Sequence, residues 1–179
     1  GRLGEIWAAR AEGHEIASHG CGHFDGGKWN VRDWKSEFDS FAGTLRDAYS
    51  LNGIDGEPEG WKDFATAEIK GFRAPYLSTN DALRTALADN GFAYDASDVS
   101  RGPAEPATRH GLSRFALPQI AEGPGGRRVI AMDYNLFVRH SGGFEREDKD
   151  GAFEQRTIEA FPTAFDREYR GGRVPLQLG

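Results

Sequence analysis

Hydrophobic positions recur along this chain with two different spacings, which predict helices separated by short strands. The clearest predicted helix follows Asn30, a plausible N-cap. Apolar residues then recur every three or four positions, at Val31, Trp34, Phe38, Phe41, Leu45 and Ala48. Similar spacing predicts helices over 3–10, from Asn80 to Asn90, and over 153–169. We expect Pro162 to kink or split the last of these.

Short apolar runs between these helices predict strands. They cover 15–18, 69–73, 92–94, 113–117, 128–132 and 174–178, with irregular loops expected over 97–112 and 137–149. Helices and strands therefore alternate over most of the chain. Such alternation is typical of an α/β fold, in which helices cover a largely parallel sheet.

Composition limits the classes of protein and of partner. The 179 residues fit a single domain, residues 1–179, and 38% of them are hydrophobic, enough for a core. The formal net charge of −6 argues against nucleic acid as a partner. No apolar run is long enough to span a membrane, and no signal peptide is visible. The chain begins without methionine and ends after an apolar run, so we expect a domain truncated at both ends.

Two histidines after the first predicted strand are candidate metal ligands. His19 and His23 lie four residues apart, and Gly20 and Gly22 let the backbone curl so that both imidazoles face one ion. Imidazole is a common ligand of zinc. An isolated pair with this spacing also arises often by chance. Cys21 between them is either a further ligand or a small loop residue, and we favour the loop residue.

Four polar residues follow predicted strands and are far apart in the sequence. They are His19, Arg73, Asp95 and Asp133. The carboxyl ends of parallel strands meet at one edge, where barrels of this design carry their sites. We therefore expect these four side chains to gather on one rim.

Three local patterns, taken together, resemble the polysaccharide deacetylases, the NodB-homology group of carbohydrate esterases similar to family 4. They are Glu15–His23, Gly71–Tyr76 and, more loosely, Gly91–Ser97. The resemblance implies a distorted or incomplete (β/α) barrel of the NodB-homology type. It also implies that residues 1–179 are part of a catalytic domain.

The resemblance also implies roles for individual residues. His19 and His23 would bind a divalent metal, most often Zn²⁺, with Co²⁺ or Ni²⁺ as alternatives. Arg73 would orient the catalytic base through an ion pair, and the main-chain NH of Tyr76 would help to hold the oxyanion. Asp95 is a further catalytic candidate near the third pattern, although the tryptophan often found there is absent.

This sequence departs from the family pattern at several points. Gly20 stands where Ser or Thr usually follows the first histidine. The Asp-Asp strand, which supplies the catalytic base and a third metal ligand, is expected to precede Gly1. The histidine that acts as general acid is expected just after Gly179. Half of the catalytic residues would then lie outside this chain, which by itself would be inactive.

Three further residues are candidates for substrate binding. Pro75 lies within the second pattern. Asp133 either caps a strand end or touches substrate, and Trp29 either stacks on a sugar ring or packs at a helix start. The other histidines, His14 among them, are expected to be solvated or to pack.

The expected function is metal-dependent removal of N-acetyl groups from an amino-sugar polysaccharide or oligosaccharide, such as chitin-like polymers, peptidoglycan or exopolysaccharide. This substrate implies a periplasmic, secreted or cell-surface protein. Two alternatives stay open. One is a superfamily hydrolase of a small non-peptide amide, and the other is a carbohydrate-binding domain of the same fold without catalysis.

Overall fold

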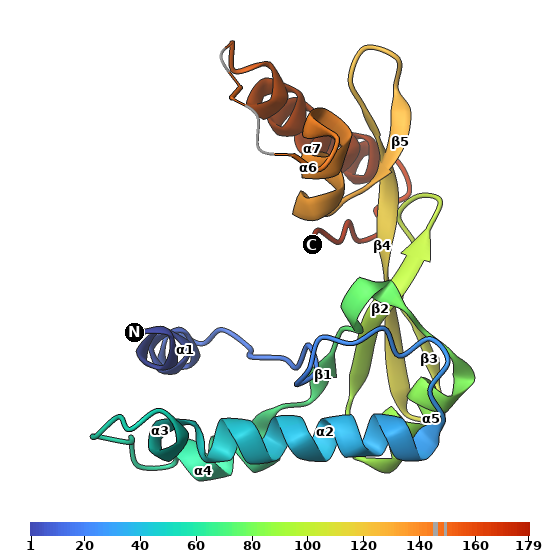
Figure 1. Cartoon of the computed structure of the whole chain (residues 1–179). Coiled ribbons are helices and arrows are strands. Elements are labelled where there is room, and N and C mark those ends of the chain that lie inside the picture. Colours follow the sequence, from blue (N-terminus) through green and yellow to red (C-terminus); the bar gives the residue numbers. More distant parts are fainter. Residues whose placement is uncertain (145–146, 149) are drawn as a thin grey trace. The chain divides into compact units, whose positions relative to one another are not determined.

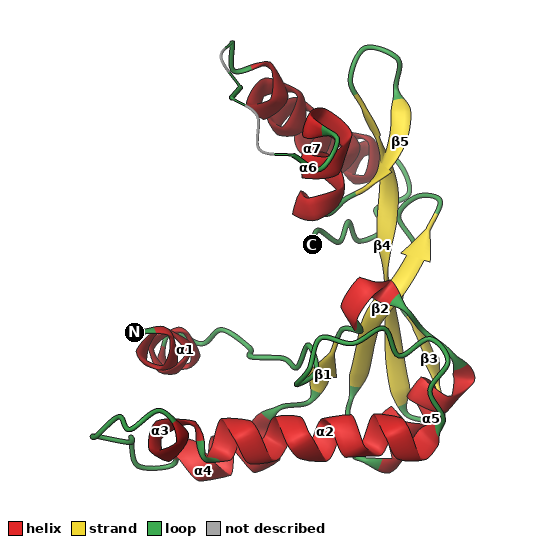
Figure 2. Ribbon diagram, viewed as in Figure 1, coloured by secondary structure: helices red, strands yellow, loops and turns green. Residues whose placement is uncertain are grey.

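The fold is seen in a computed structural model of the chain, which describes residues 1–144, 147–148 and 150–179. It contains two compact units (Figures 1 and 2). The first comprises residues 1–97 and 108–114, and the second comprises residues 98–107 and 115–179. Helices and a five-stranded sheet are both present, so the expected α/β class is confirmed. The expected regular alternation is not observed, because the four described strands between Tyr94 and Ile130 follow one another without a helix between them.

The first unit contains most of the helices. They are α1 (Arg2–Ala11), α2 (Val31–Arg46), α3 (Ala48–Leu51), α4 (Trp61–Asp63), the π-helical turn η1 (Phe64–Glu68), the 3-10 turn η2 (Pro75–Leu77) and α5 (Asp81–Asp89). Both predicted N-caps are confirmed. The Asn30 side chain accepts hydrogen bonds from the first turn of α2, and the Asn80 side chain accepts one from Leu83 in α5.

The strands form one sheet with the order β1-β2-β4-β3, and β5 pairs with β4. Their bounds are β1 (Gly71–Phe72), β2 (Tyr94–Ser100), β3 (Ala107–Arg109), β4 (Leu112–Glu122) and β5 (Arg127–Ile130). Strands β1 and β2 are parallel, with Phe72 opposite Asp95. On its other side Phe72 forms a parallel bridge with Ser18. The three chain segments expected to carry the site therefore lie side by side.

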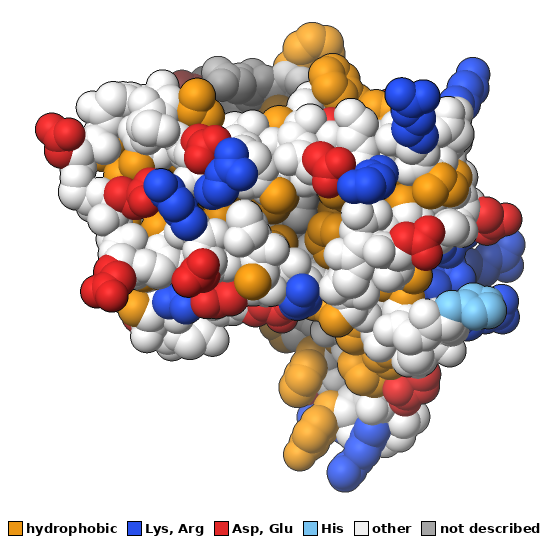
Figure 3. Space-filling view, turned by 90° about the horizontal axis from the view of Figure 1, so that it is seen from below, with side chains coloured by type: hydrophobic (Ala, Val, Ile, Leu, Met, Phe, Trp, Pro, Cys, Tyr) orange, Lys and Arg blue, Asp and Glu red, His pale blue; other side chains and the backbone are white. Residues whose placement is uncertain are grey.

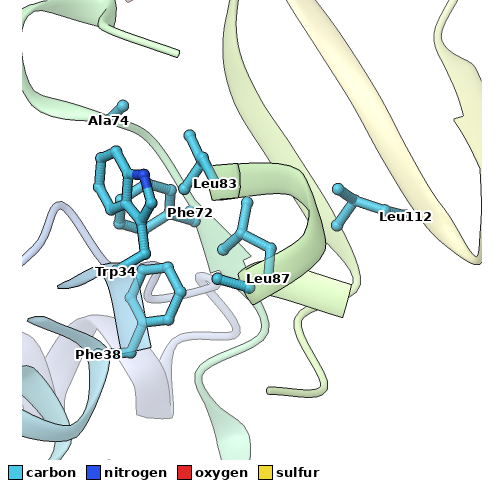
Figure 4. Close-up of a cluster of buried hydrophobic side chains, with 8 residues drawn as sticks. Trp34, Phe38, Phe72, Ala74, Leu83, Leu87 and Leu112 are labelled. Atoms are coloured by element: carbon cyan, nitrogen blue, oxygen red, sulfur yellow. The ribbon is translucent and has the colours of Figure 1, made fainter. Parts of the chain in front are cut away.

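A hydrophobic cluster joins α2, β1 and α5 beneath these segments (Figure 4). Trp34 and Phe38 of α2 both meet the ring of Phe72 edge-on, with ring centroids 6.0 and 5.2 Å away. Leu83 and Leu87 of α5 close the cluster, and both are fully buried. Aromatic and aliphatic packing of this density holds the start of α2 and the end of β1 in one fixed arrangement.

The second unit is built on β4, β5 and two helices, α6 (Asp133–Ser141) and α7 (Ala152–Arg170). Strands β4 and β5 are antiparallel, with Ile120 opposite Val129. Both of these residues belong to a second hydrophobic cluster, together with Leu136 of α6 and Ala160 and Ala164 of α7.

The structure corrects two parts of the expected architecture. The sheet of the described residues does not close into a barrel, and the β4–β5 pair is antiparallel, so the sheet is mixed. The predicted loop over 97–112 is also wrong in part, because β2 continues to Ser100 and β3 forms within it. These segments are mostly polar, and every residue of β3 is exposed, so no apolar pattern marks them as strands.

Predictions for the last third of the chain were also wrong in whole or in part. Helix α6 replaces the start of the loop expected over 137–149. Pro162 does not split the last helix, because α7 runs through it as one helix; Pro162 lies on the exposed side, where the carbonyl group left without a donor meets water. The expected kink stays a prediction. Residues 174–178 form no strand in the described part of the chain. Leu176 of this run packs against the second cluster instead.

Charged side chains of both signs lie on the surface. The face in Figure 3 carries acidic and basic side chains. Within the described residues, no helix has both the length and the apolar character needed to cross a bilayer.

Candidate metal centre

The two candidate ligands lie on the loop that leaves the edge of the sheet after Ser18. The Ser18 amide donates to Gly71 O at 2.9 Å, and the Arg73 amide donates to Ser18 O at 3.0 Å. These two bonds align the end of the first extended segment with the end of β1. They place His19 next to Arg73, as the expected rim requires.

The ring of His19 has a defined orientation and tautomer. Its Nδ1 lies 2.8 Å from the carbonyl oxygen of Arg73. A carbonyl oxygen can only accept, so Nδ1 carries the hydrogen and donates it. The lone pair of the neutral imidazole is therefore on Nε2. A backbone carbonyl that holds one ring nitrogen in this way is the usual arrangement around a metal-binding histidine.

His23 lies beside His19. The two ring centroids are 5.1 Å apart, with the planes at 72°. His23 has a φ of 53°, in the left-handed region that few residues with side chains adopt. The loop therefore turns sharply at this residue, and the turn brings the second imidazole back towards the first. Both side chains are exposed.

Tyr76 is the third ring in this group. Its centroid lies 5.1 Å from that of His23. Tyr76 is the middle residue of η2 and also has a positive φ, 58°, while its side chain is 68% exposed. Strained backbone at both His23 and Tyr76 indicates that the surrounding structure dictates these conformations. Pro75 is buried beneath the turn, so its side chain supports the turn from inside.

Arg73 is fixed from the other direction. Its Nε donates to the carbonyl oxygen of Ala96 at 3.1 Å. The guanidinium lines an open hollow of about 380 Å³, together with His19, Phe72 and Tyr94. Burial raises the pKa of Tyr94, and the charge of Glu15 and a hydrogen bond to Glu15 raise it further. The charge of Arg73 acts in the opposite direction. Tyr94 therefore stays neutral near pH 7.

Asp95 lies within β2 and is 1% exposed. Its Oδ1 accepts hydrogen bonds from the amide and the hydroxyl of Ser97. The Ser97 hydroxyl oxygen in turn accepts from the Ala74 amide at 2.8 Å. Asp95 is thus connected through Ser97 to the turn that carries Tyr76, a contact that predicts a role in holding this turn.

The remaining two candidates make other contacts. Trp29 packs against Trp34, with centroids 4.8 Å apart, and is partly buried at the start of α2, where helix-start packing was the alternative to sugar stacking. Asp133 belongs to the second unit, where it begins α6 and its Oδ1 accepts from the Tyr134 amide at 2.6 Å.

Sequence reasoning missed Glu37, which holds the histidine loop. Its Oε1 accepts hydrogen bonds from the amides of Cys21 and Gly22. A signal was present, because Glu37 falls three positions after Trp34 and four before Phe41, on the apolar side of α2. A carboxylate in that stripe needs a buried partner.

The donor set fits a metal that prefers nitrogen ligands, but it is incomplete. His19 and His23 offer two imidazoles on one side of a loop. The part of the chain that the structure describes contains no group of three or more His, Cys, Asp or Glu side chains placed to hold one ion. These residues therefore supply two candidate protein ligands and leave the other coordination positions of an ion open.

Comparison with known proteins gives the fold a context. No protein-family model and no curated protein matches the chain. Among solved structures, it matches one described as a probable polysaccharide deacetylase from Pseudomonas aeruginosa PAO1, with a TM-score of 0.53 and 20% identity. The chain has a deacetylase-like fold. It also matches Puue allantoinase, with a TM-score of 0.53 and 21% identity.

These matches extend over nearly the whole chain but only part of the other proteins. They cover 99% of this chain and 49% of each of the two solved structures, so the chain spans about half their length. The resemblance read from the three local patterns is confirmed for the deacetylase-like fold. The metal and the individual residue roles stay predictions.

Proposed function

We propose that this chain is part of a metal-dependent hydrolase that removes N-acetyl groups from an amino-sugar polysaccharide or oligosaccharide. The observation that carries the proposal is the His19 imidazole. Its Nδ1 donates a hydrogen bond to the Arg73 carbonyl oxygen. The centroid of the His23 ring lies 5.1 Å from the centroid of the His19 ring. A deacetylase-like fold supports this interpretation. A saccharide of this kind would place the protein in the periplasm, at the cell surface or outside the cell.

We assign each residue of the group a task in this reaction. His19 and His23 would hold the ion, His19 through Nε2. When bound, a zinc-like ion lowers the pKa of water and polarises a carbonyl group. Arg73, fixed by Ala96, would pair with the carboxylate that accepts the proton and keep it ionised. The Tyr76 amide would donate to the oxyanion. Asp95 and Ser97 would keep the turn that carries this amide in place.

A second candidate is hydrolysis of a small non-peptide amide at the same site. The match to Puue allantoinase is the observation that raises it, with the same TM-score as the deacetylase match. Both candidate functions would use the same histidines and the same fold. They differ in the substrate that the surroundings of the site would accept, a saccharide chain or a small amide. A fold match at this level of identity supports both equally.

The experiment compares amide substrates in the protein that carries this sequence. Acetate release from N-acetylglucosamine oligomers is measured after metal removal and after return of Zn²⁺, with allantoin as the small-amide comparison. We expect release that requires both Zn²⁺ and His19. His14→Ala is the matched control for His19→Ala, because His14 lies in the same stretch and its side chain is 70% exposed.

The outcomes separate the candidates. Zinc-dependent acetate release that is lost in His19→Ala and kept in His14→Ala supports the deacetylase. Turnover of allantoin alone supports the small-amide hydrolase. Zinc bound through His19 without turnover of either would indicate a carbohydrate-binding domain, and no bound zinc would refute the proposal.

A further inference from the structure

Three successive amides of the histidine loop donate to side chains instead of to backbone. The Gly20 amide donates to Ser18 Oγ at 3.2 Å. The Cys21 and Gly22 amides both donate to Glu37 Oε1, at 2.6 and 2.7 Å. All three residues between His19 and His23 therefore donate their amides to side-chain oxygen atoms. One carboxylate oxygen of α2 accepts two of these three hydrogen bonds.

Glu37 is placed for this contact by the core. It lies on α2 between Trp34 and Phe38, and it is 9% exposed. A carboxylate so far from water is costly unless hydrogen bonds compensate for its lost hydration. Charge-assisted bonds from two backbone amides do so, and they are stronger than bonds between neutral groups. Since α2 is fixed by Phe72 and α5, the loop is fixed to the same core.

Gly20 is fitted to the same carboxylate. Its φ is +80°, and a Cβ atom built on it would lie 2.9 Å from Glu37 Oε1. Both the backbone conformation and the contact with Glu37 therefore disfavour a side chain. At this position, where the family pattern usually has Ser or Thr, the carboxylate of Glu37 lies where the side chain would begin.

We infer that Glu37 is a positioning residue, which holds the His19–His23 loop in the conformation that presents both imidazoles to one metal ion. The inference rests on the proposed function, because it concerns the same metal site. Within the described residues, Glu37 makes no hydrogen bond to either imidazole, and it acts through the amides of Cys21 and Gly22. The loop is then ordered before metal arrives, so binding does not have to order it.

The test measures metal binding and loop structure separately. Co²⁺ is titrated into the metal-free protein, and its visible absorption reports affinity and coordination geometry. Hydrogen exchange of the Cys21 and Gly22 amides is measured by NMR in the same protein before Co²⁺ is added. The variants are Glu37→Ala, which removes the acceptor, and Glu37→Gln, which keeps a neutral oxygen acceptor of the same length.

Two controls separate positioning from general damage. Asp39→Ala removes an exposed carboxylate of the same helix, which contacts Lys35 at 2.9 Å. Leu83→Ala lowers stability through the core without touching the loop. All measurements are made at a temperature where every variant is folded, as judged by circular dichroism.

We expect Glu37→Ala to lower Co²⁺ affinity about 10–100-fold, the usual effect of removing a group that orients metal ligands. The two amides should lose protection, and Glu37→Gln should restore part of both. Asp39→Ala and Leu83→Ala should bind Co²⁺ as the unchanged protein does. Unchanged affinity in Glu37→Ala, or an equal loss in Leu83→Ala, would overturn the inference.

Failure of the proposed function would look different. In that case the unchanged protein would bind no Co²⁺, or His19→Ala would bind it equally well. The metal role of Glu37 would then be refuted together with the site. Loss of amide protection in Glu37→Ala would in that event assign Glu37 to the folding of the loop alone.

Discussion

Two independent features favour glycine at position 20, its positive φ and the contact that a side chain would make with Glu37. The cost of each can be measured separately. The positive φ costs a residue with a side chain about 1–2 kcal/mol. The contact of a new Cβ with Glu37 adds to that cost. We therefore predict that Gly20→Ser, although it restores the residue common in the family pattern, destabilises the protein by more than 1 kcal/mol in urea unfolding. It should also weaken Co²⁺ binding.

Gly13 provides the control for this prediction. Its φ is +90°, and a Cβ there would meet nothing within 4 Å. Gly13→Ser should therefore show the conformational cost alone, with Co²⁺ affinity unchanged. If the two variants lose equal stability, the contact between position 20 and Glu37 carries no energy and the fit described above is wrong.

Glu122 of β4 is the other buried carboxylate with a clear electrostatic role. His140 and Arg139 of α6 and Arg156 of α7 all face it, and it is 2% exposed. Burial by itself raises the pKa of Glu122, but hydrogen bonds from His140 and Arg139 and the charge of Arg156 outweigh burial. The net pKa is therefore lowered.

The sign of the pH dependence follows from this lowered pKa. The stabilisation is complete above the ordinary glutamate pKa of about 4.3 and is lost as pH falls below it towards the folded-state value. We predict that Glu122→Gln costs about 1–3 kcal/mol at pH 7 and reduces the loss of stability as the pH falls below about 4.3.

Urea unfolding followed by circular dichroism across this pH range tests the prediction. Glu159→Gln is the control, since Glu159 is exposed on α7 and accepts a hydrogen bond from Gln155 of the same helix. If the free energy of unfolding of Glu122→Gln falls with decreasing pH as it does in the unchanged protein, Glu122 does not contribute to the pH dependence of stability.

At the scale of elements, Asn80 does more than cap α5. Its Oδ1 accepts from the Leu83 amide at 2.8 Å, and its Nδ2 donates to the carbonyls of Gly27 and Trp29 at 3.1 and 2.9 Å. It therefore joins the start of α5 to the segment that leads into α2. We predict that Asn80→Ala lowers the free energy of unfolding by more than the loss of an N-cap usually does, which is about 0.5–2 kcal/mol.

Asn30→Ala is the reference for this prediction, because Asn30 caps α2 and its side chain accepts hydrogen bonds only from the first turn of that helix within the described residues. Asn80→Asp separates the two roles, since it keeps the acceptor and loses the Nδ2 donor. Stability is measured by urea unfolding. Equal costs for Asn80→Ala and Asn30→Ala would show that the contacts to the loop contribute nothing.

Elements with complete sequence signals could be predicted, and those that depend on distant partners could not. Helices α2 and α5 have an asparagine cap and a full apolar stripe, and both were found close to their observed bounds. Helix α6 was missed. Its buried residues are Leu136 and Ser141, and its Arg139 and His140 are explained only by Glu122. No local pattern reveals such a partner.

At the scale of the whole molecule, parallel strand order explains which site residues could be found. His19 and Arg73 follow neighbouring parallel segments, so their proximity could be inferred from the chain alone. Glu37 could not be inferred in this way, because its role depends on how α2 packs over β1 and on the path of the loop. Asp133 was grouped with them as a strand-end residue, although it begins a helix in the second unit.

The distribution of tryptophans provides a whole-molecule measurement of the proposed metal site. All four tryptophans, Trp7, Trp29, Trp34 and Trp61, lie in the first unit, which also contains His19 and His23. Tryptophan fluorescence therefore reports unfolding of the unit that would bind metal. A ligand that binds only the folded state stabilises it by about 2.7 kcal/mol at one hundred times its dissociation constant.

We predict that Zn²⁺ at this excess raises the midpoint of thermal unfolding, followed by tryptophan fluorescence, by roughly 5–10 °C, since 1 kcal/mol corresponds to about 2–4 °C for a chain of this size. His19→Ala and His23→Ala should each abolish the shift, because either change leaves a single imidazole. His14→Ala should keep it. A shift that persists without His19 would place the zinc elsewhere, and this would separate the deacetylase-like fold from the metal chemistry proposed for it.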